Sequence, residues 1–324
     1  MESRDAGFPY LTCPHCRVAL DTASCCPECA RCYPGGDFSE GRYYDQFDAS
    51  TVLTPEHREG LELEVEGTRR RILDFYLPLL DGEAPGRRLT SRRDAGVPER
   101  RRPGGWPGGV PPPRVLDCGC GNGLSVDLLN DRGFEAWGND LSQLRKWQWR
   151  EREHRDRLVV ASALALPFPD KYFDVVISSG VIEHIGVEET AVPRYAVKPL
   201  PDRDALRAAF LRELLRVTKT AIYLDCPNGA FPIDFWHSDR PGSPRFHSRR
   251  EGFLPTFDEI RALVPEDVRV EPLSPYKRLQ FRQAAQHWYG RALGKPAEWF
   301  FRFMPRFVAK SALNPFLVVR VTPS

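Results

Sequence analysis

The chain has 324 residues, of which 41% are hydrophobic and 28% are charged, and this composition is typical of a globular protein with a buried core. Its formal net charge of +2 argues against nucleic-acid binding by overall electrostatics, so a polyanion would need a local basic patch. No apolar signal segment follows a basic start, and no apolar run approaches the roughly 18 residues of a membrane-spanning helix. We therefore expect a cytoplasmic protein.

Six of the nine cysteines fall between Cys13 and Cys32, and this clustering favours metal binding over disulfide formation. Two C-x-x-C knuckles can present four thiolates to one tetrahedral ion. We expect residues 1–40 to form a zinc ribbon with structural Zn²⁺. The expected ligands are Cys13, Cys16, Cys26 and Cys29. Cys25 and Cys32 remain alternative ligands, and unligated buried cysteines are the other alternative.

The composition divides the rest of the chain into three parts. Residues 41–80 read as a helical arm that begins near Pro55, with Leu61, Val65, Ile72, Phe75 and Leu79 on one apolar face. Residues 81–113 are rich in Pro, Gly and Arg, which indicates a linker. Residues 114–324 then alternate short apolar runs with helical stretches, the rhythm of an α/β domain.

Seven apolar runs in this last part predict strands. They cover residues 114–119, 134–140, 157–163, 172–179, 220–227, 268–273 and 316–322. The first run leads into Asp117-Cys118-Gly119-Cys120-Gly121-Asn122-Gly123, and glycines at such a turn allow a ligand close to the backbone at a helix start. The second run ends in Asp140, where a carboxylate can accept hydrogen bonds from ribose hydroxyls. The alternative is a tight turn without a ligand.

These residues resemble the class I S-adenosylmethionine-dependent methyltransferases, whose first motif is D-x-G-x-G-x-G. The resemblance extends over roughly residues 114–230. Within this class, the combined motifs are most similar to the ubiquinone- and menaquinone-biosynthesis-like branch, with a methyltransferase type 11 domain. It implies a Rossmann-like seven-stranded sheet sandwiched by helices, with strand order 3-2-1-4-5-7-6 and an antiparallel seventh strand. It also implies an enzyme of EC 2.1.1.- with S-adenosyl-L-methionine as cofactor.

The resemblance further implies cofactor-binding residues. Asp117 and the loop of Gly119, Cys120, Gly121 and Gly123 would hold the aminocarboxypropyl end. Asp140 would hold the ribose, and Leu141 would pack near the adenine. Ser162, Ala163 and Leu164 lie in a segment like the family's G-D-A-x-x-L-P-F, where Ser162 replaces an Asp. Ser178 and Ser179 would lie beside the methionine moiety.

A general base helps methyl transfer when the nucleophile is a hydroxyl or an acidic carbon. His184, Glu183 and His237 are our candidates, with Tyr195 and Asp234 as further ones. The neutral imidazole of His184 suits proton abstraction near pH 7. The alternative for Glu183 and His184 is a pair that caps a helix or fixes a loop. Tyr43 and Tyr44 would close over the cofactor or pack the arm against the core.

Residues 277–312, before the last run, combine eight aromatic residues with eight Lys or Arg between Lys277 and Lys310. This insert is a lid on the core, an interfacial surface for a lipid-linked substrate, or a platform for RNA. We expect a small-molecule or lipid- or glycan-linked acceptor, with peripheral contact at the inner membrane face through this insert. Ribosomal or transfer RNA is the alternative acceptor, and a non-enzymatic zinc-ribbon binding module is the alternative from another class.

Overall fold

A computed structural model describes residues 11–45, 47, 55–83, 111–190, 196–237, 244–279 and 288–323. The chain divides into two compact units, which are described separately below. The first unit comprises Met1–Ile177 and Glu213–Thr220, and the second comprises Ser178–Arg212 and Ala221–Ser324. None of the helices in the described ranges is long and apolar enough to cross a membrane.

Seven strands form one mixed sheet, in the order β10-β11-β7-β4-β1-β2-β3. Their bounds are β1 Arg114–Cys118, β2 Glu135–Asp140, β3 Leu158–Val160, β4 Phe173–Ser179, β7 Thr218–Pro227, β10 Arg269–Pro272 and β11 Phe316–Thr322. β2 runs parallel to both β1 and β3, whereas β11 is antiparallel to both β7 and β10. In chain order this is 3-2-1-4-5-7-6, so the predicted α/β fold and strand order are confirmed.

The central strands form because their sequences are apolar on both faces. All but one residue of β4 are buried, and β11 buries five of its seven residues. Strands covered on both faces read as continuous apolar runs. β3 differs from prediction, since it ends at Val160 and the chain then leaves the sheet.

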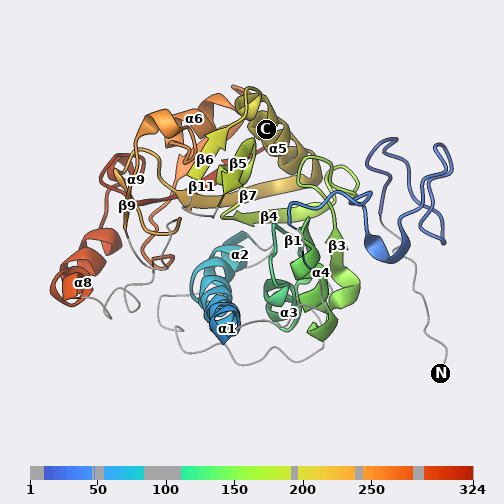
Figure 1. The fold of residues 1–324 in the computed structure, drawn as a ribbon, viewed down its shortest axis with the longest axis horizontal. Coiled ribbons are helices and arrows are strands. Elements are labelled where there is room, and N and C mark those ends of the chain that lie inside the picture. Colours follow the sequence, from blue (N-terminus) through green and yellow to red (C-terminus); the bar gives the residue numbers. More distant parts are fainter. Residues whose placement is uncertain are drawn as a thin grey trace. The chain divides into compact units, whose positions relative to one another are not determined.

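In the first unit, helix α1 (Pro55–Arg70) continues through a π-helical turn (Arg71–Tyr76) into α2 (Leu77–Glu83) (Figure 1). The helix starts at Pro55 as predicted, because proline needs no N–H partner in a first turn. Residues 41–45 of the predicted arm are not helical. Ile72 and Phe75 are buried, as their apolar spacing indicates. The described part of the predicted linker is residues 81–83 and 111–113, and the rest lies outside the described residues.

Two further α-helices of the first unit follow strands of the sheet. They are α3 (Leu124–Asn130) after β1 and α4 (Gln143–Gln148) after β2. Gly123 precedes α3 with φ +75°, and a Cβ there would lie 2.7 Å from Leu158 Cδ1. Glycine is therefore required at this turn for its backbone conformation and for its missing side chain.

The second unit adds short elements to its strands. They are the hairpin β5 (Val187–Thr190) with β6 (Ala196–Pro199), the pair β8 (Ile233–Asp234) with β9 (Arg245–Phe246), and helices α6 (Phe257–Ala262), α8 (Trp288–Arg302) and α9 (Arg306–Ala309). Helix α5 (Arg203–Val217) has residues in both units. The described residues of the 277–312 insert are thus mainly helical.

Candidate functional site

The glycine turn of the first unit is tied to the end of β2. The backbone N–H groups of Gly119 and Cys120 donate to Asn139 O at 2.9 and 3.0 Å, and Gly121 N donates to Asp140 Oδ2 at 3.0 Å. Gly119, Gly121 and Gly123 all have positive φ. Three backbone N–H groups of the motif therefore tie the turn to the end of β2, and one of them binds the Asp140 carboxylate.

Asp140 keeps acceptor capacity for a ligand. Its other oxygen accepts the Leu141 N–H at 2.8 Å, and a carboxylate has about four acceptor positions. Burial raises the pKa of Asp140 to about 6, although Arg145 and the hydrogen bonds from Gly121, Leu141 and Tyr44 lower it. The hydrogen bonds from Gly121, Leu141 and Tyr44 leave one acceptor position on this buried carboxylate, at the place where the resemblance implies the cofactor ribose.

Helix α1 and the following π-helical turn supply charged side chains that sequence reasoning missed. Glu64 Oε2 pairs with Arg145 Nη1 at 2.7 Å, and Glu64 Oε1 accepts from Asn122 Nδ2 at 3.3 Å. Arg71 Nη2 lies 3.9 Å from Asp117 Oδ2. Arg71 Nε is buried and has no hydrogen-bond partner among the described residues. No local spacing links these positions to the glycine turn.

The segment before α1 also reaches this end of β2. The Asp45 carboxylate accepts from Ser142 Oγ at 2.6 Å and Gln143 N at 2.7 Å, so it caps the start of α4. Tyr44 N donates to Leu141 O at 3.2 Å. Tyr43 Oη donates to Asp37 Oδ2 at 2.7 Å, which fits the packing role that the sequence left open for it.

Among the other predicted cofactor residues, the two serines of β4 differ. Ser178 Oγ is buried without a partner in the described ranges. Ser179 Oγ donates to Asp225 Oδ1 at 2.8 Å and accepts from Arg278 Nη2 at 3.1 Å. Ser162 Oγ accepts from Leu164 N at 3.2 Å, so this hydroxyl shapes its own turn together with the Ala163 and Leu164 backbone.

The cysteines of the first unit form one cluster and one disulfide. The sulfur atoms of the cluster lie within 4.8 Å of one another, and its members are Cys13, Cys16, Cys26 and Cys29. Cys25 and Cys32 form a disulfide with each other, so these two alternative ligands are occupied. The expectation that the cysteine cluster favours metal binding over disulfide formation is therefore wrong for this pair, and so is the alternative in which Cys25 or Cys32 replaces a ligand.

Each knuckle forms a backbone turn of the same kind, and these turns bring the sulfur atoms together. Arg17 N donates to Cys13 O and Ala30 N donates to Cys26 O, both at 2.9 Å, and Arg17 and Ala30 both have positive φ. Burial raises the pKa of the Cys13 thiol, but hydrogen bonds from the Cys16 backbone, Tyr33 and the His15 backbone outweigh it and lower the pKa to about 6. Four converging thiols of this kind suit a soft divalent ion.

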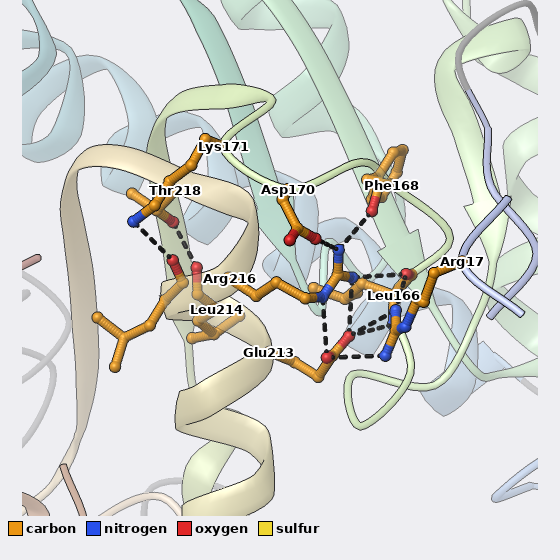
Figure 2. Close-up of polar contacts among 10 residues, drawn as sticks. Arg17, Leu166, Phe168, Asp170, Lys171, Glu213, Leu214, Arg216 and Thr218 are labelled. Carbon is orange, nitrogen blue, oxygen red and sulfur yellow. Dashed lines mark hydrogen bonds and ion pairs between the residues drawn. The ribbon is translucent and has the colours of Figure 1, made fainter. Parts of the chain in front are cut away.

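Arg17 attaches the cysteine knuckles to the rest of the first unit (Figure 2). Its guanidinium pairs with Glu213 Oε1 at 2.9 Å and donates to Leu166 O at 3.2 Å. Glu213 also pairs with Arg216 at 2.9 Å and accepts from Leu166 N at 3.0 Å. Burial raises the pKa of Glu213, but the two arginines and Leu166 N outweigh it and hold the pKa below its usual value.

A pocket of about 230 Å³ lies in the second unit, where the three predicted catalytic residues meet. It is lined by Gly180, Glu183, His184, Pro227, Trp236, His237, Arg278 and Phe316. Glu183 and His184 belong to the 3-10 turn Ile182–His184 that follows β4, and His237 follows β8. Tyr195, a further sequence candidate, lies outside the described residues. The structure brings Glu183, His184 and His237 together, which sequence spacing does not reveal.

Arg278 is the pocket residue that the sequence did not single out. Its guanidinium makes two bonds to the buried Asp225 carboxylate, at 3.0 and 3.1 Å, and stacks 4.6 Å from the Phe316 ring centroid. These contacts fix a positive charge in the wall of the pocket.

An open α/β sheet with a glycine turn after β1 and a carboxylate at the end of β2 defines the Rossmann-like fold class. Within that class, residues 116–221 match the family model described as a methyltransferase domain.

Sequence relatives agree with this match. The chain is 35% identical over 71 residues to a probable S-adenosylmethionine-dependent methyltransferase of Mycolicibacterium smegmatis, which covers 22% of this chain and 28% of that protein. It is 33% identical over 132 residues to 2-methyl-6-phytyl-1,4-hydroquinone methyltransferase of Synechocystis sp., which covers 38% of this chain and 36% of that protein. The chain thus spans about a third of the length of these curated relatives.

Solved structures with a similar fold include a chain from the complex between the Haloferax volcanii Trm112 methyltransferase activator and a methyltransferase. It is 16% identical, covers 84% of this chain and 98% of that chain, and has a TM-score of 0.42.

Proposed function

We propose that the protein is an S-adenosylmethionine-dependent methyltransferase, EC 2.1.1.-, whose cofactor is held by the glycine turn and Asp140 of the first unit. The observation that carries this proposal is the buried Asp140 carboxylate at the end of β2, which is bound to the glycine turn and keeps one acceptor position for a ribose hydroxyl. The match of residues 116–221 to a methyltransferase domain and the name of the M. smegmatis relative support it.

The charged groups near the turn suit the amino acid end of the cofactor. Asp117 is buried at the end of β1 and would bind the ammonium group. Arg71, with its unpartnered buried Nε, would bind the carboxylate. Opposite charges on these two side chains match the zwitterion, which would otherwise be desolvated without partners.

The remaining cofactor residues are proposed from the sequence motifs. Leu141 would contact the adenine, with Ser162, Ala163 and Leu164 at its edge. When bound, the cofactor supplies an activated methyl group on a sulfonium. The protein's contribution would then be mainly to align the acceptor and to exclude water.

Glu183, His184 and His237 are proposed to act on the acceptor. They lie in a small pocket whose wall also carries Trp236 and Phe316, and such a mixture suits a compact, partly apolar molecule. The Synechocystis relative is named for a hydroquinone with a phytyl chain, which supports a small-molecule or lipid-linked acceptor.

Helix α8 and the residues after it favour a lipid-linked acceptor, because their aromatic side chains are exposed. Phe301, Met304 and Val308 pack into a small core, whereas Trp299, Phe303 and Phe307 are 67%, 61% and 70% exposed. Lys295, Arg302, Arg306 and Lys310 belong to the same segment. Exposed aromatics beside cations suit an anionic membrane surface, so we propose peripheral membrane contact through residues 277–312.

Vesicle binding tests this surface. We expect the protein to float with vesicles of phosphatidylglycerol and phosphatidylcholine, and the double variant Trp299→Ser, Phe303→Ser to remain in the soluble fraction. Equal flotation of both proteins would refute the membrane contact. RNA binding that weakens steeply with salt would instead move the acceptor to RNA.

We also propose that Cys13, Cys16, Cys26 and Cys29 bind one structural Zn²⁺. The cluster and its matched knuckle turns support this proposal. Zinc held by four thiolates leaves no open coordination position, so its role would be to stabilise residues 11–45 rather than to take part in the reaction.

Calorimetry of S-adenosylmethionine binding tests the main proposal. We expect one site in the wild type and a loss of affinity of roughly 100-fold in Asp140→Asn, because hydrogen bonds to a charged group contribute about 1.5–3 kcal/mol. Asp131→Asn, an exposed carboxylate on the same unit, is the matched control and should bind normally. Absence of binding by a folded, zinc-loaded wild type would leave the non-enzymatic binding module as the better explanation.

A further inference from the structure

The pocket of the second unit contains an unusual carboxylate. Glu183 is only 1% exposed, and its Oε2 is buried with no hydrogen-bond partner among the residues that the structure describes. Burying a carboxylate without a partner costs several kcal/mol. Ligand atoms of Glu183, His184 and His237 all lie within 4.8 Å of one another. A cation between these three groups would offset the cost of burial.

Both imidazoles are engaged by a carboxylate at the same ring nitrogen. His184 Nδ1 is 2.5 Å from Glu189 Oε1, and His237 Nδ1 is 3.0 Å from the buried Asp234 Oδ2. An acceptor at Nδ1 favours the tautomer with a proton there, in which Nε2 is the ring nitrogen that carries the lone pair. Histidines that bind metals are held in this way, since the carboxylate orients the ring and raises its basicity.

The backbone around the carboxylate is fixed by a buried arginine. Arg207 Nη2 donates to Glu183 O at 3.0 Å and to Phe253 O at 2.5 Å, while its Nε donates to Ile185 O at 3.2 Å. The Phe253 ring packs against both imidazoles, with centroid distances of 5.9 and 4.8 Å. The three side chains are therefore held in place before any ligand arrives, as a metal site requires.

We propose that Glu183, His184 and His237 bind one divalent first-row transition-metal ion through the Glu183 carboxylate and the Nε2 atoms of the two histidines. Two histidines and one carboxylate leave coordination positions open, and the 230 Å³ pocket gives room for an oxygen of a substrate. With both histidines as ligands, neither is the general base that the sequence suggested. A role for the ion in methyl transfer rests on the proposed function, whereas binding of the ion does not.

Titration with Mn²⁺ tests the site in the full-length protein after the cysteine cluster is loaded with zinc. Thiolates favour zinc over the harder Mn²⁺, so the added ion reports on the histidine site. Loss of the free-ion paramagnetic resonance signal should show one bound Mn²⁺ per chain. We expect His184→Gln and Glu183→Gln to weaken binding by at least about 100-fold, and Glu189→Gln by roughly tenfold through reorientation of the His184 ring.

His247→Gln removes a histidine of the same unit outside the cluster and should bind Mn²⁺ as the wild type does. Melting temperatures within a few degrees of the wild type will show that each variant is folded. The proposal is overturned if folded wild type binds no Mn²⁺ at millimolar concentration, or if His184→Gln binds it equally well. S-adenosylmethionine calorimetry on the same samples separates this result from a failure of the proposed function.

Discussion

The glycine turn of the first unit and the histidine pocket of the second unit are assembled differently. The turn is one continuous segment, and its backbone N–H groups bond to the end of β2, including the Asp140 carboxylate. The pocket takes side chains from the turn after β4, from the β8 region, and from Arg278 and Phe316. A turn that uses backbone groups can bind the same cofactor in many proteins, whereas the side chains of a pocket can change with the acceptor.

The turn should be the more fragile of the two sites, and Gly123→Ala tests this most directly. Its φ of +75° and the 2.7 Å approach of a Cβ to Leu158 predict both backbone strain and overpacking. We expect a loss of about 2–4 kcal/mol of unfolding free energy together with loss of cofactor binding. Chemical denaturation and calorimetry measure the two effects.

Gly133→Ala is the matched control, because Gly133 has φ +83° but no atom within 4 Å of a new Cβ. It should show only the backbone strain, about 1 kcal/mol. If both variants lose equal stability, crowding at Gly123 is not the cause.

Cofactor affinity at the glycine turn should also be independent of how the cysteine knuckles are attached to the first unit. Glu213→Gln removes the carboxylate that pairs with both Arg17 and Arg216 (Figure 2). We expect the free energy of unfolding to fall by roughly 2–3 kcal/mol. Cofactor affinity of the folded protein should change by less than about threefold. Asp170→Asn, which removes a 73% exposed partner of Arg216, should cost about 0.5 kcal/mol or less.

A much larger fall in cofactor affinity for Glu213→Gln would show that the knuckles and the turn act as one site. Thermal unfolding and calorimetry on the same samples separate these outcomes.

The pH dependence of cofactor affinity at the turn is expected to be a smaller effect than the loss of stability in Gly123→Ala or Glu213→Gln. Burial raises the pKa of Asp140 to about 6, so ionising it costs the ligand-free protein stability as the pH rises through that value. The ribose needs the ionised carboxylate, and cofactor affinity should therefore increase about tenfold from pH 5 to pH 7. Asp140→Asn should lack this dependence, and a similar slope in that variant would assign it to another group.

The difference between the two sites also explains what could be predicted from the sequence. The sequence predicts a glycine turn with Asp117 and Asp140 because their spacing encodes a local backbone shape, and the strand order is implied by the family that these motifs resemble. The meeting of Glu183 and His184 with His237 depends on how distant segments pack, so the sequence offered candidates but no geometry. Arg71, Glu64 and Arg278 lie far along the chain from their partners and left no signal.

The disulfide marks another limit of spacing arguments. Cys25 and Cys32 lie between and beside the knuckles, and counting C-x-x-C patterns leaves their state open. Their pairing follows from the turn that brings these two backbone segments together as a β-bridge, which is a property of the folded chain.

One contact near the cysteine knuckles covers the edge of the sheet at β3. β3 is the last strand of the sheet, and Phe38 N donates to Val160 O at 2.7 Å beside a bridge between Asp37 and Val160. An uncovered edge strand invites pairing with a neighbouring molecule. Residues 37 and 38 occupy this position, so a chain shortened by residues 1–40, or one that lacks the proposed zinc ion, should self-associate through β3, which size-exclusion chromatography measures.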